Sequence, residues 1–413
     1  MFEQIRKQYL KEINSTAHMY KHQSGAELMY IENTDPNKAF SITFKTPPFD
    51  NTGVFHILEH CVLCGSKGYN STDPFNDLSK YYLYNYLNAI TFPDKTMYPI
   101  SSYNDKAFLN SVKVYLDAVF NPRIEENELI FLQEGWRYED GKYNGIVYNE
   151  MKEAYSDIHK QIEFFVMQEL FKDTKYKYSS AGRAEHIVNL TYENFLKTYK
   201  DYYKPSNAYI YLYGNLNINE MQNMIHEEYL KDYTEYTHVN MAKDEIQTPV
   251  ETYKKYYSTN TKDTYATICY VIDTIENVKL MEAMSLLIEI LISQQYGSIR
   301  LALQDLCEEV TGDFYKDISQ PIFSITVKNP TVCIKTIKKK IYETLGNLSR
   351  SGIEKKIVQS VVNKKIFAYK EEDYGYRPKG LAYNFSTIDH WINNYDPLLN
   401  FGKIWVTKLL QKI

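Results

Sequence analysis

Two histidines and one glutamate fall within five consecutive residues, in an arrangement that can bind a metal ion. The segment is His56-Ile-Leu-Glu59-His60, and a helix is predicted there. Positions i and i+4 of a helix lie one turn apart on one face, so the two imidazoles can converge on one Zn²⁺ at about 2.0–2.1 Å each. Glu59 flanks the same face, where its carboxylate can accept a proton from a water molecule. This order is the inverse of His-Glu-x-x-His and is typical of zinc peptidases. The alternative interpretation is a solvated helix face.

A catalytic zinc site needs a third protein ligand and leaves the fourth position to water. The predicted helix that opens at Ile146 offers three carboxylates on one face, those of Glu150, Glu153 and Asp157. They occupy positions i, i+3 and i+7, and this spacing does not choose among them.

Two cysteines beside the histidines form a Cys-x-x-Cys pair, which is a second pattern found at metal sites. On a continuous helix Cys64 would lie about 12 Å along the axis from His56. No second Cys-x-x-Cys or His-x-x-x-His pair follows in the sequence, as a closed zinc site would need. We therefore interpret Cys61 and Cys64 as packed thiols.

The elements that must position these residues alternate between short strands and helices. The metal-binding helix is predicted to begin near Val54 and to stop at Gly65, a natural C-terminal cap. In the first part of the chain, strands are predicted over 26–32, 39–45, 87–92, 96–100 and 208–213, and helices over 105–119, 126–134, 147–171 and 192–203.

A polar, charged stretch over 231–250 predicts a domain boundary. Beyond it, strands are predicted over 266–272 and 322–327, and helices over 278–293, 331–350 and 353–371. The two halves share this mixed pattern, so we expect an α+β protein of two domains, 1–235 and 236–413.

Composition excludes several classes of protein. The 413 residues carry 47 Lys and Arg against 52 Asp and Glu, a net charge of −5, whereas a nucleic-acid binder needs an excess of basic residues. The most apolar stretch, 280–292, contains Glu282 and Glu289, which argues against a membrane span. The first residues lack the apolar segment of a signal peptide, and the 5 cysteines are sparse, as in reduced compartments. We therefore expect a cytoplasmic protein that binds neither nucleic acid nor membrane.

The sequence around the histidines resembles a known family. The run from Thr46-Pro-Pro through Gly53 to Ser66 is similar to the inverted-zincin peptidases of the pitrilysin and insulysin clan, in the branch of presequence protease and falcilysin. The similarity continues, in order, through 73–75, 87–91, 94–99, 115–120, 133–137, 145–152, 203–208 and 213–215.

The resemblance implies a role for each candidate residue. The third zinc ligand would be Glu150, from the segment Asn-Glu-Met-Lys. Glu59 would be the general base of a metalloendopeptidase that holds one Zn²⁺ per chain. Asn88 and Ala89 would lie on the edge strand along which family members hold unfolded peptides by β-augmentation. The sequence departs from the family pattern at two positions. Pro93 stands where a small residue is expected after that strand, and Ala181 stands where a glycine is usual.

Length is the larger departure from the family. Its members resemble four αβ domains joined in two halves, and this chain is similar to the first half only. The resemblance thus implies two homologous pitrilysin-like domains, the second without metal and incomplete at its C-terminus. The alternative function is a truncated zinc-binding homologue with little activity alone, a half-subunit that needs a second-half chain or a homodimer partner.

Overall fold

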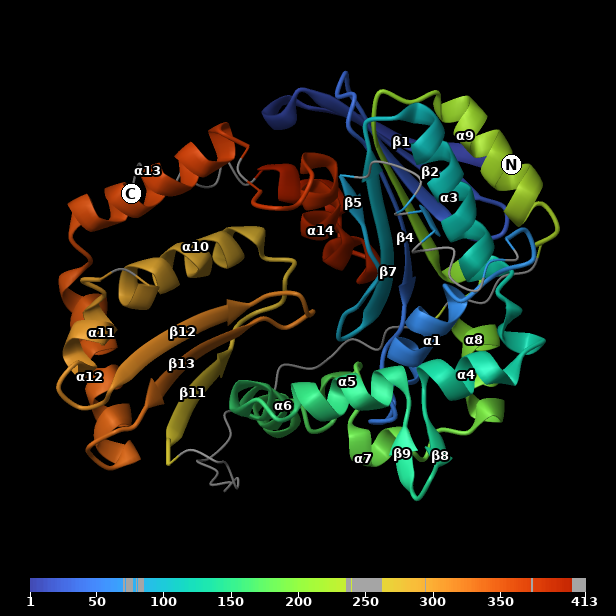
Figure 1. The fold of residues 1–413 in the computed structure, drawn as a ribbon. Coiled ribbons are helices and arrows are strands. Elements are labelled where there is room, and N and C mark those ends of the chain that lie inside the picture. Colours follow the sequence, from blue (N-terminus) through green and yellow to red (C-terminus); the bar gives the residue numbers. More distant parts are fainter. Residues whose placement is uncertain are drawn as a thin grey trace. The chain divides into compact units, whose positions relative to one another are not determined.

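The computed structural model describes residues 1–402 apart from 70, 72–76, 79, 81–84, 235–238, 240–261, 294 and 373. The chain divides into two compact units (Figure 1). The first comprises Met1–Lys243 and Tyr374–Ile388, and the second comprises Asp244–Asp373 and Asp389–Ile413. The predicted boundary between residues 235 and 236 stays a prediction.

The first unit is built on one sheet, which has eight strands in the part of the chain that is described. In spatial order these are β1 (Phe2–Leu10), β2 (Ser15–His22), β3 (Glu27–Glu32), β10 (Ala208–Gly214), β4 (Lys38–Lys45), β7 (Lys95–Ser102) and β5 (Tyr86–Leu87), with β6 (Ile90–Thr91) also paired to β7. Strands β3 and β10 run parallel, and the other neighbours are antiparallel. Strands β5 and β6 therefore form one edge of this sheet.

Strand β4 shows how the sheet is buried on both faces. Phe40, Ile42 and Phe44 point into the main hydrophobic core, and Ser41 and Thr43, which alternate with them, point to the opposite face. All eight residues of β4 are buried. Both faces of the sheet are therefore covered at β4.

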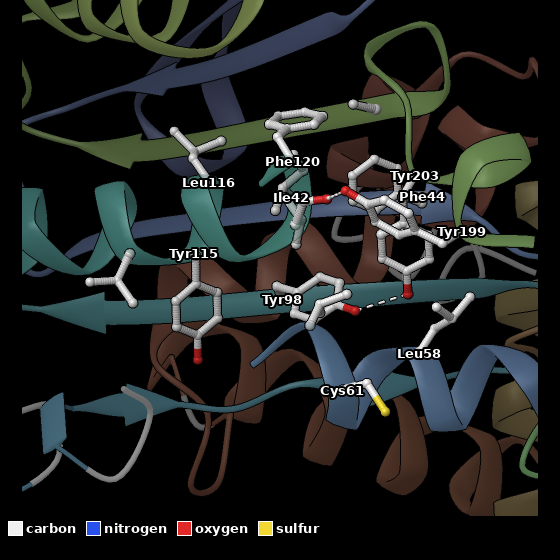
Figure 2. Close-up of a cluster of buried hydrophobic side chains, with 14 of the residues drawn as sticks. Ile42, Phe44, Leu58, Cys61, Tyr98, Tyr115, Leu116, Phe120, Tyr199 and Tyr203 are labelled. Carbon is white, nitrogen blue, oxygen red and sulfur yellow. Dashed lines mark hydrogen bonds between the residues drawn. The ribbon is translucent and has the colours of Figure 1, made fainter. Parts of the chain in front are cut away.

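Helices cover the core face of the sheet. Those that contribute buried residues to this core are α1 (Val54–Val62), α3 (Asp105–Phe120), α4 (Glu128–Glu134), α5 (Ile146–Ala154), α7 (Ala184–Ile187), α8 (Tyr192–Tyr202) and α9 (Ile218–Ile225). Figure 2 shows the aromatic part of this core, where the hydroxyl groups of Tyr98 and Tyr203 lie 2.9 Å apart. This mutual hydrogen bond satisfies two polar groups that would otherwise be costly to bury.

The helical pattern predicted over 147–171 forms two helices instead of one. Helix α5 ends at Ala154, and α6 (Ile158–Leu170) begins after Asp157, whose side chain accepts a hydrogen bond from the backbone N–H of His159. An aspartate that caps a new helix competes with continuation of the previous one. The hairpin of β8 (Arg137–Glu139) and β9 (Lys142–Asn144) was also not predicted.

The opposite face of the sheet is covered by a segment from far along the sequence. Residues Tyr374–Ile388, which include the start of α14 (Lys379–Ile392), belong to the first unit. Tyr211 of β10 donates a hydrogen bond to the carbonyl oxygen of Gly380 at 2.9 Å, and Asn384 donates one to Ser41 of β4. These hydrogen bonds satisfy polar groups that this segment buries on the non-core face.

The second unit contains a three-stranded antiparallel sheet in the order β11 (Tyr265–Val271), β13 (Ile322–Lys328) and β12 (Glu309–Tyr315). Its helices are α10 (Val278–Ile288), α11 (Ser298–Leu303), α12 (Ile334–Ser351) and α13 (Lys355–Lys370). Buried residues of the sheet, such as Ile325 and Val327, pack in one cluster with Ile337 and Ile341 of α12.

The predicted α+β class is confirmed. Most predicted elements of both units agree with the structure within a few residues, whereas β1, β2, β12, α7, α9, α11 and α14 were not predicted. No helix among the described residues is both long and apolar enough to cross a membrane.

Candidate metal centre

Helix α1 presents both histidines on one face. It begins after Gly53, which has a left-handed backbone conformation, and its apolar residues, such as Phe55 and Leu58, are buried in the core. This packing fixes the rotation of the helix. The imidazole centroids of His56 and His60 lie 5.0 Å apart with the rings nearly perpendicular, at 81°.

Glu150 of α5 is the carboxylate that meets the two histidines. Its Oε2 lies 3.7 Å from Nε2 of His56 and 3.8 Å from Nε2 of His60. The three ligand atoms lie within 4.8 Å of one another, and no other group of three or more potential ligands is found in the described part of the chain. Neither Glu153 nor Asp157 belongs to this group.

The three residues fit a zinc ion. Two imidazoles and one carboxylate are a donor set of catalytic zinc sites, and tetrahedral bonds of about 2.0–2.1 Å separate the donor atoms by about 3.3–3.4 Å. The distances of 3.7 and 3.8 Å from Glu150 to the two histidines are close to that separation. Half of the Glu150 side chain is exposed, so the site remains accessible from one side.

Each histidine is oriented through its other ring nitrogen. Nδ1 of His56 lies 3.0 Å from the carbonyl oxygen of Ala181, and Nδ1 of His60 lies 3.2 Å from Oε2 of Glu134. A carbonyl or carboxylate oxygen only accepts, so each Nδ1 atom donates, and in the neutral ring Nε2 keeps a lone pair for a metal. This arrangement, with a carboxylate or carbonyl behind the histidine, is typical of metal-binding imidazoles.

Sequence reasoning did not identify Glu134. Its side chain is only 8% exposed, and its Oε1 accepts a hydrogen bond from Gln133 at 3.0 Å. The available signal was its place in Gln133-Glu-Gly-Trp-Arg, one of the segments that carry the family resemblance.

The surroundings of His60 favour positive charge. Burial disfavours its protonated form, but the hydrogen bond with Glu134 and the nearby carboxylates outweigh burial and raise the pKa of His60 above its usual value. The same negative potential would also attract a metal cation.

Glu59 is connected to the edge of the sheet. Its carboxylate is largely buried, and its Oε2 accepts a hydrogen bond of 2.7 Å from the hydroxyl of Thr91 in β6. Asn88 and Ala89 lie between β5 and β6 on the same edge. The N–H of Asn88 donates to the carbonyl oxygen of Pro99 in β7 at 3.2 Å, which continues the pairing across this gap.

The two departures from the family pattern lie near these groups. Ala181 supplies the carbonyl oxygen behind His56 from its backbone, so its methyl side chain takes no part in that contact. Pro93 follows Phe92 in the turn between β6 and β7, where the N–H of Phe92 donates to Lys95 at 2.8 Å. Proline has no backbone N–H to donate. Since this turn uses the N–H of the preceding residue, Phe92, it can accommodate proline.

Two protein-family models match this chain. Residues 47–177 match the family described as insulinase (peptidase family M16), and residues 189–365 match the peptidase M16 inactive domain. The chain belongs to the M16 peptidases. Its resemblance to the pitrilysin and presequence protease branch is confirmed.

Curated relatives of this M16 chain are longer. Protein HypA of Clostridium perfringens is 38% identical over 430 aligned residues, which cover 100% of this chain and 44% of that protein. Presequence protease 1 of Arabidopsis thaliana is 34% identical over 416 residues, which cover 96% of this chain and 38% of that protein. The chain thus spans about two fifths of the length of these relatives.

Solved M16 structures share the fold at low sequence identity. A protease from Helicobacter pylori superposes with a TM-score of 0.74 at 14% identity, covering 96% of this chain and 95% of that one. Pitrilysin superposes with a TM-score of 0.70 at 15% identity, covering 100% of this chain and 45% of that one. The pitrilysin-like fold predicted from the resemblance is therefore present.

Proposed function

We propose that this chain is the zinc-binding part of a metalloendopeptidase that hydrolyses unfolded peptides. In this proposal His56, His60 and Glu150 hold one Zn²⁺, and Glu59 is the general base. The observation that carries it is the convergence of three ligand atoms within 4.8 Å beside a glutamate that is hydrogen-bonded to the sheet edge.

The chain's own residues supply proton transfer and orientation. When bound there, zinc would act as a Lewis acid that lowers the pKa of water to about 7 and polarises a peptide carbonyl. The Glu59 carboxylate accepts the proton of the attacking water and passes it to the leaving amine, a role typically worth about 10²–10⁴-fold in rate. The hydrogen bond from Thr91 engages Oε2 of Glu59. This bond holds the carboxylate in one orientation and leaves Oε1 for the proton.

The edge strand supports a preference for unfolded peptides. Strands β5 and β6 pair with β7 on one side only, among the residues described. An edge strand binds an extended peptide through backbone hydrogen bonds, and the extended segments of a folded protein are mostly paired already. Asn88 and Ala89 would supply part of this backbone surface.

A partner chain belongs to the alternative form of the proposal. This chain spans 38% to 44% of the curated relatives, so a second-half chain or a second copy would complete an active enzyme. A protein of similar length shares this fold, since the superposition covers 95% of the protease from Helicobacter pylori. The alternative is a zinc-binding half-subunit with little activity alone.

Zinc content and peptide hydrolysis, measured on the same preparation, test the proposal. We expect one zinc per chain and cleavage of an unfolded peptide that is abolished by Glu59→Gln. A chain without zinc under saturating conditions would contradict the proposal. A zinc-loaded chain that cleaves nothing would favour the half-subunit alternative.

A further inference from the structure

The non-core face of the edge strand is lined by one cation and two aromatic rings from a distant part of the sequence. The ring of Tyr376 stacks on Tyr86 of β5, with 6.4 Å between centroids, and Phe385 contacts Phe92 edge-on at 6.0 Å. Arg377 follows Tyr376 in the sequence, and its guanidinium lies near the rings of both Tyr376 and Phe385. We refer to Tyr376, Arg377 and Phe385 as the side wall.

The side wall belongs to the first unit, as does the edge strand. It is anchored through the hydrogen bonds that Gly380 and Asn384 make with β10 and β4. Its position beside the edge strand is therefore a consequence of packing within one unit.

Arg377 has a charge that no described residue neutralises. Its guanidinium carbon lies 4.4 Å from the ring centroid of Phe385 and 5.6 Å from that of Tyr376, in the range of cation–π contacts. In the described part of the chain no carboxylate pairs with it, and its Nε is buried without a hydrogen-bond partner. A guanidinium offers five N–H donors and stays charged at all physiological pH values.

A peptide added to this edge would present its side chains alternately to two surfaces, because successive residues of a strand point to opposite faces. Leu87 and Ala89 of the edge pack against the core, and Thr91 reaches Glu59 on that same side. Tyr86 and Phe92 point the other way, to the side wall. Every second side chain of a bound peptide would therefore point to the face of the sheet on which Arg377 and the two rings lie.

We propose that the side wall makes Arg377 a specificity-determining residue, which selects peptides with an aspartate or glutamate on the face opposite the metal-binding helix. A carboxylate matches the guanidinium in charge and geometry, since two parallel N–H···O bonds can form. This inference rests on the proposed function, because it requires peptides to lie along the edge strand. Tyr376 is 77% exposed, so water screens the pair and the selectivity is modest.

The first test varies the peptide only. One unfolded, fluorescently labelled peptide is made as a series in which a single glutamate moves along the sequence, each member having a matched glutamine peptide. Binding is measured by fluorescence anisotropy to the zinc-loaded Glu59→Gln chain, which prevents cleavage. We expect glutamate to strengthen binding by about 2–5-fold over glutamine at those positions of one parity that lie opposite Arg377, and to have no effect at positions of the other parity.

The second test varies the protein. Arg377→Gln should remove the preference for glutamate and leave the affinity for the glutamine peptides unchanged, and Arg377→Lys should keep part of it. A merely structural role for Arg377 would lower the affinity for both peptides alike. Arg350→Gln is the matched control, because Arg350 is an exposed arginine of α12 in the second unit.

The outcomes separate this inference from the proposed function. If all peptides bind and the glutamate and glutamine series have equal affinities, the side-wall inference is wrong and the proposed function stands. If no peptide of either series binds, both are wrong. The peptide series alone decides the matter even if Arg377→Gln does not fold.

Discussion

The carbonyl oxygen of Ala181 lies 3.0 Å from Nδ1 of His56, although 125 positions separate the two residues in the sequence. The contact exists because two glycine backbones meet beside it. A Cβ on Gly53 would lie 2.6 Å from the oxygen of Ala181, and a Cβ on Gly182 would lie 2.8 Å from Cα of Gly53. Both glycines have positive φ, at +65° and +90°. Orientation of His56 therefore depends on a close approach that larger residues would prevent.

Gly182→Ala should weaken zinc binding without changing any ligand. The added methyl group would push the 181–182 backbone away from Gly53 and break the contact with His56, which should cost about 10-fold in zinc affinity. Stability should fall by about 1–3 kcal/mol, because alanine is strained at this φ. Chelator competition and thermal unfolding measure the two effects.

Gly141→Ala is the control for this backbone strain. Gly141 also has a positive φ, at +77°, but nothing lies within 4 Å of its added Cβ. It should lose some stability and keep its zinc affinity. Equal zinc affinities in the two variants would show that the Gly53–Gly182 approach does not orient His56.

Glu134→Gln should lower zinc affinity by about 10–100-fold. The amide keeps the shape of the side chain but removes the negative charge behind His60, which makes the imidazole a poorer ligand. Glu139→Gln, at an exposed carboxylate of β8, is the matched control. Unchanged zinc affinity in Glu134→Gln would mean that the contact of 3.2 Å does not tune the site.

Glu150→Ala should lose stoichiometric zinc, whereas Glu153→Ala and Asp157→Ala should retain it. Only Glu150 reaches both histidines, at 3.7 and 3.8 Å. Metal content of the three purified variants decides the assignment. Zinc retained in Glu150→Ala and lost in Glu153→Ala would falsify it.

Glu59→Gln should keep zinc and lose hydrolysis, whereas His56→Ala should lose both. A glutamine cannot accept the proton, so the expected loss in rate is about 10²–10⁴-fold. If Glu59→Gln instead empties the site, Glu59 is a ligand and its assignment as the base is wrong.

Thr91→Val should reduce turnover with zinc retained, because the Glu59 carboxylate loses the donor that orients it. Loss of one hydrogen bond to a charged group corresponds to about 1.5–3 kcal/mol, or roughly 10–100-fold. Thr91→Ser keeps the hydroxyl and should restore most of the rate. A Thr91→Val enzyme with the rate of the unaltered chain would show that the Thr91–Glu59 bond has no catalytic role.

The sequence by itself determined the local half of the candidate site. Two histidines and a glutamate at helical spacing share a face wherever the helix lies, because the geometry of one helical turn is set by the backbone alone. The same holds for most strands and helices, whose period of apolar residues is a local property. Elements with weaker patterns were not predicted, among them β12, which contains Gly312.

Only the tertiary structure decided which distant groups meet that face. The spacing of Glu150, Glu153 and Asp157 left three candidates, and the packing of α5 against the core brings Glu150 alone to the histidines. The carboxylate of Glu134 and the carbonyl of Ala181 follow from the path of the chain, as do the side-wall contacts of Arg377. Such contacts join residues many positions apart, so they depend on how whole elements pack, and no local spacing in the sequence specifies them.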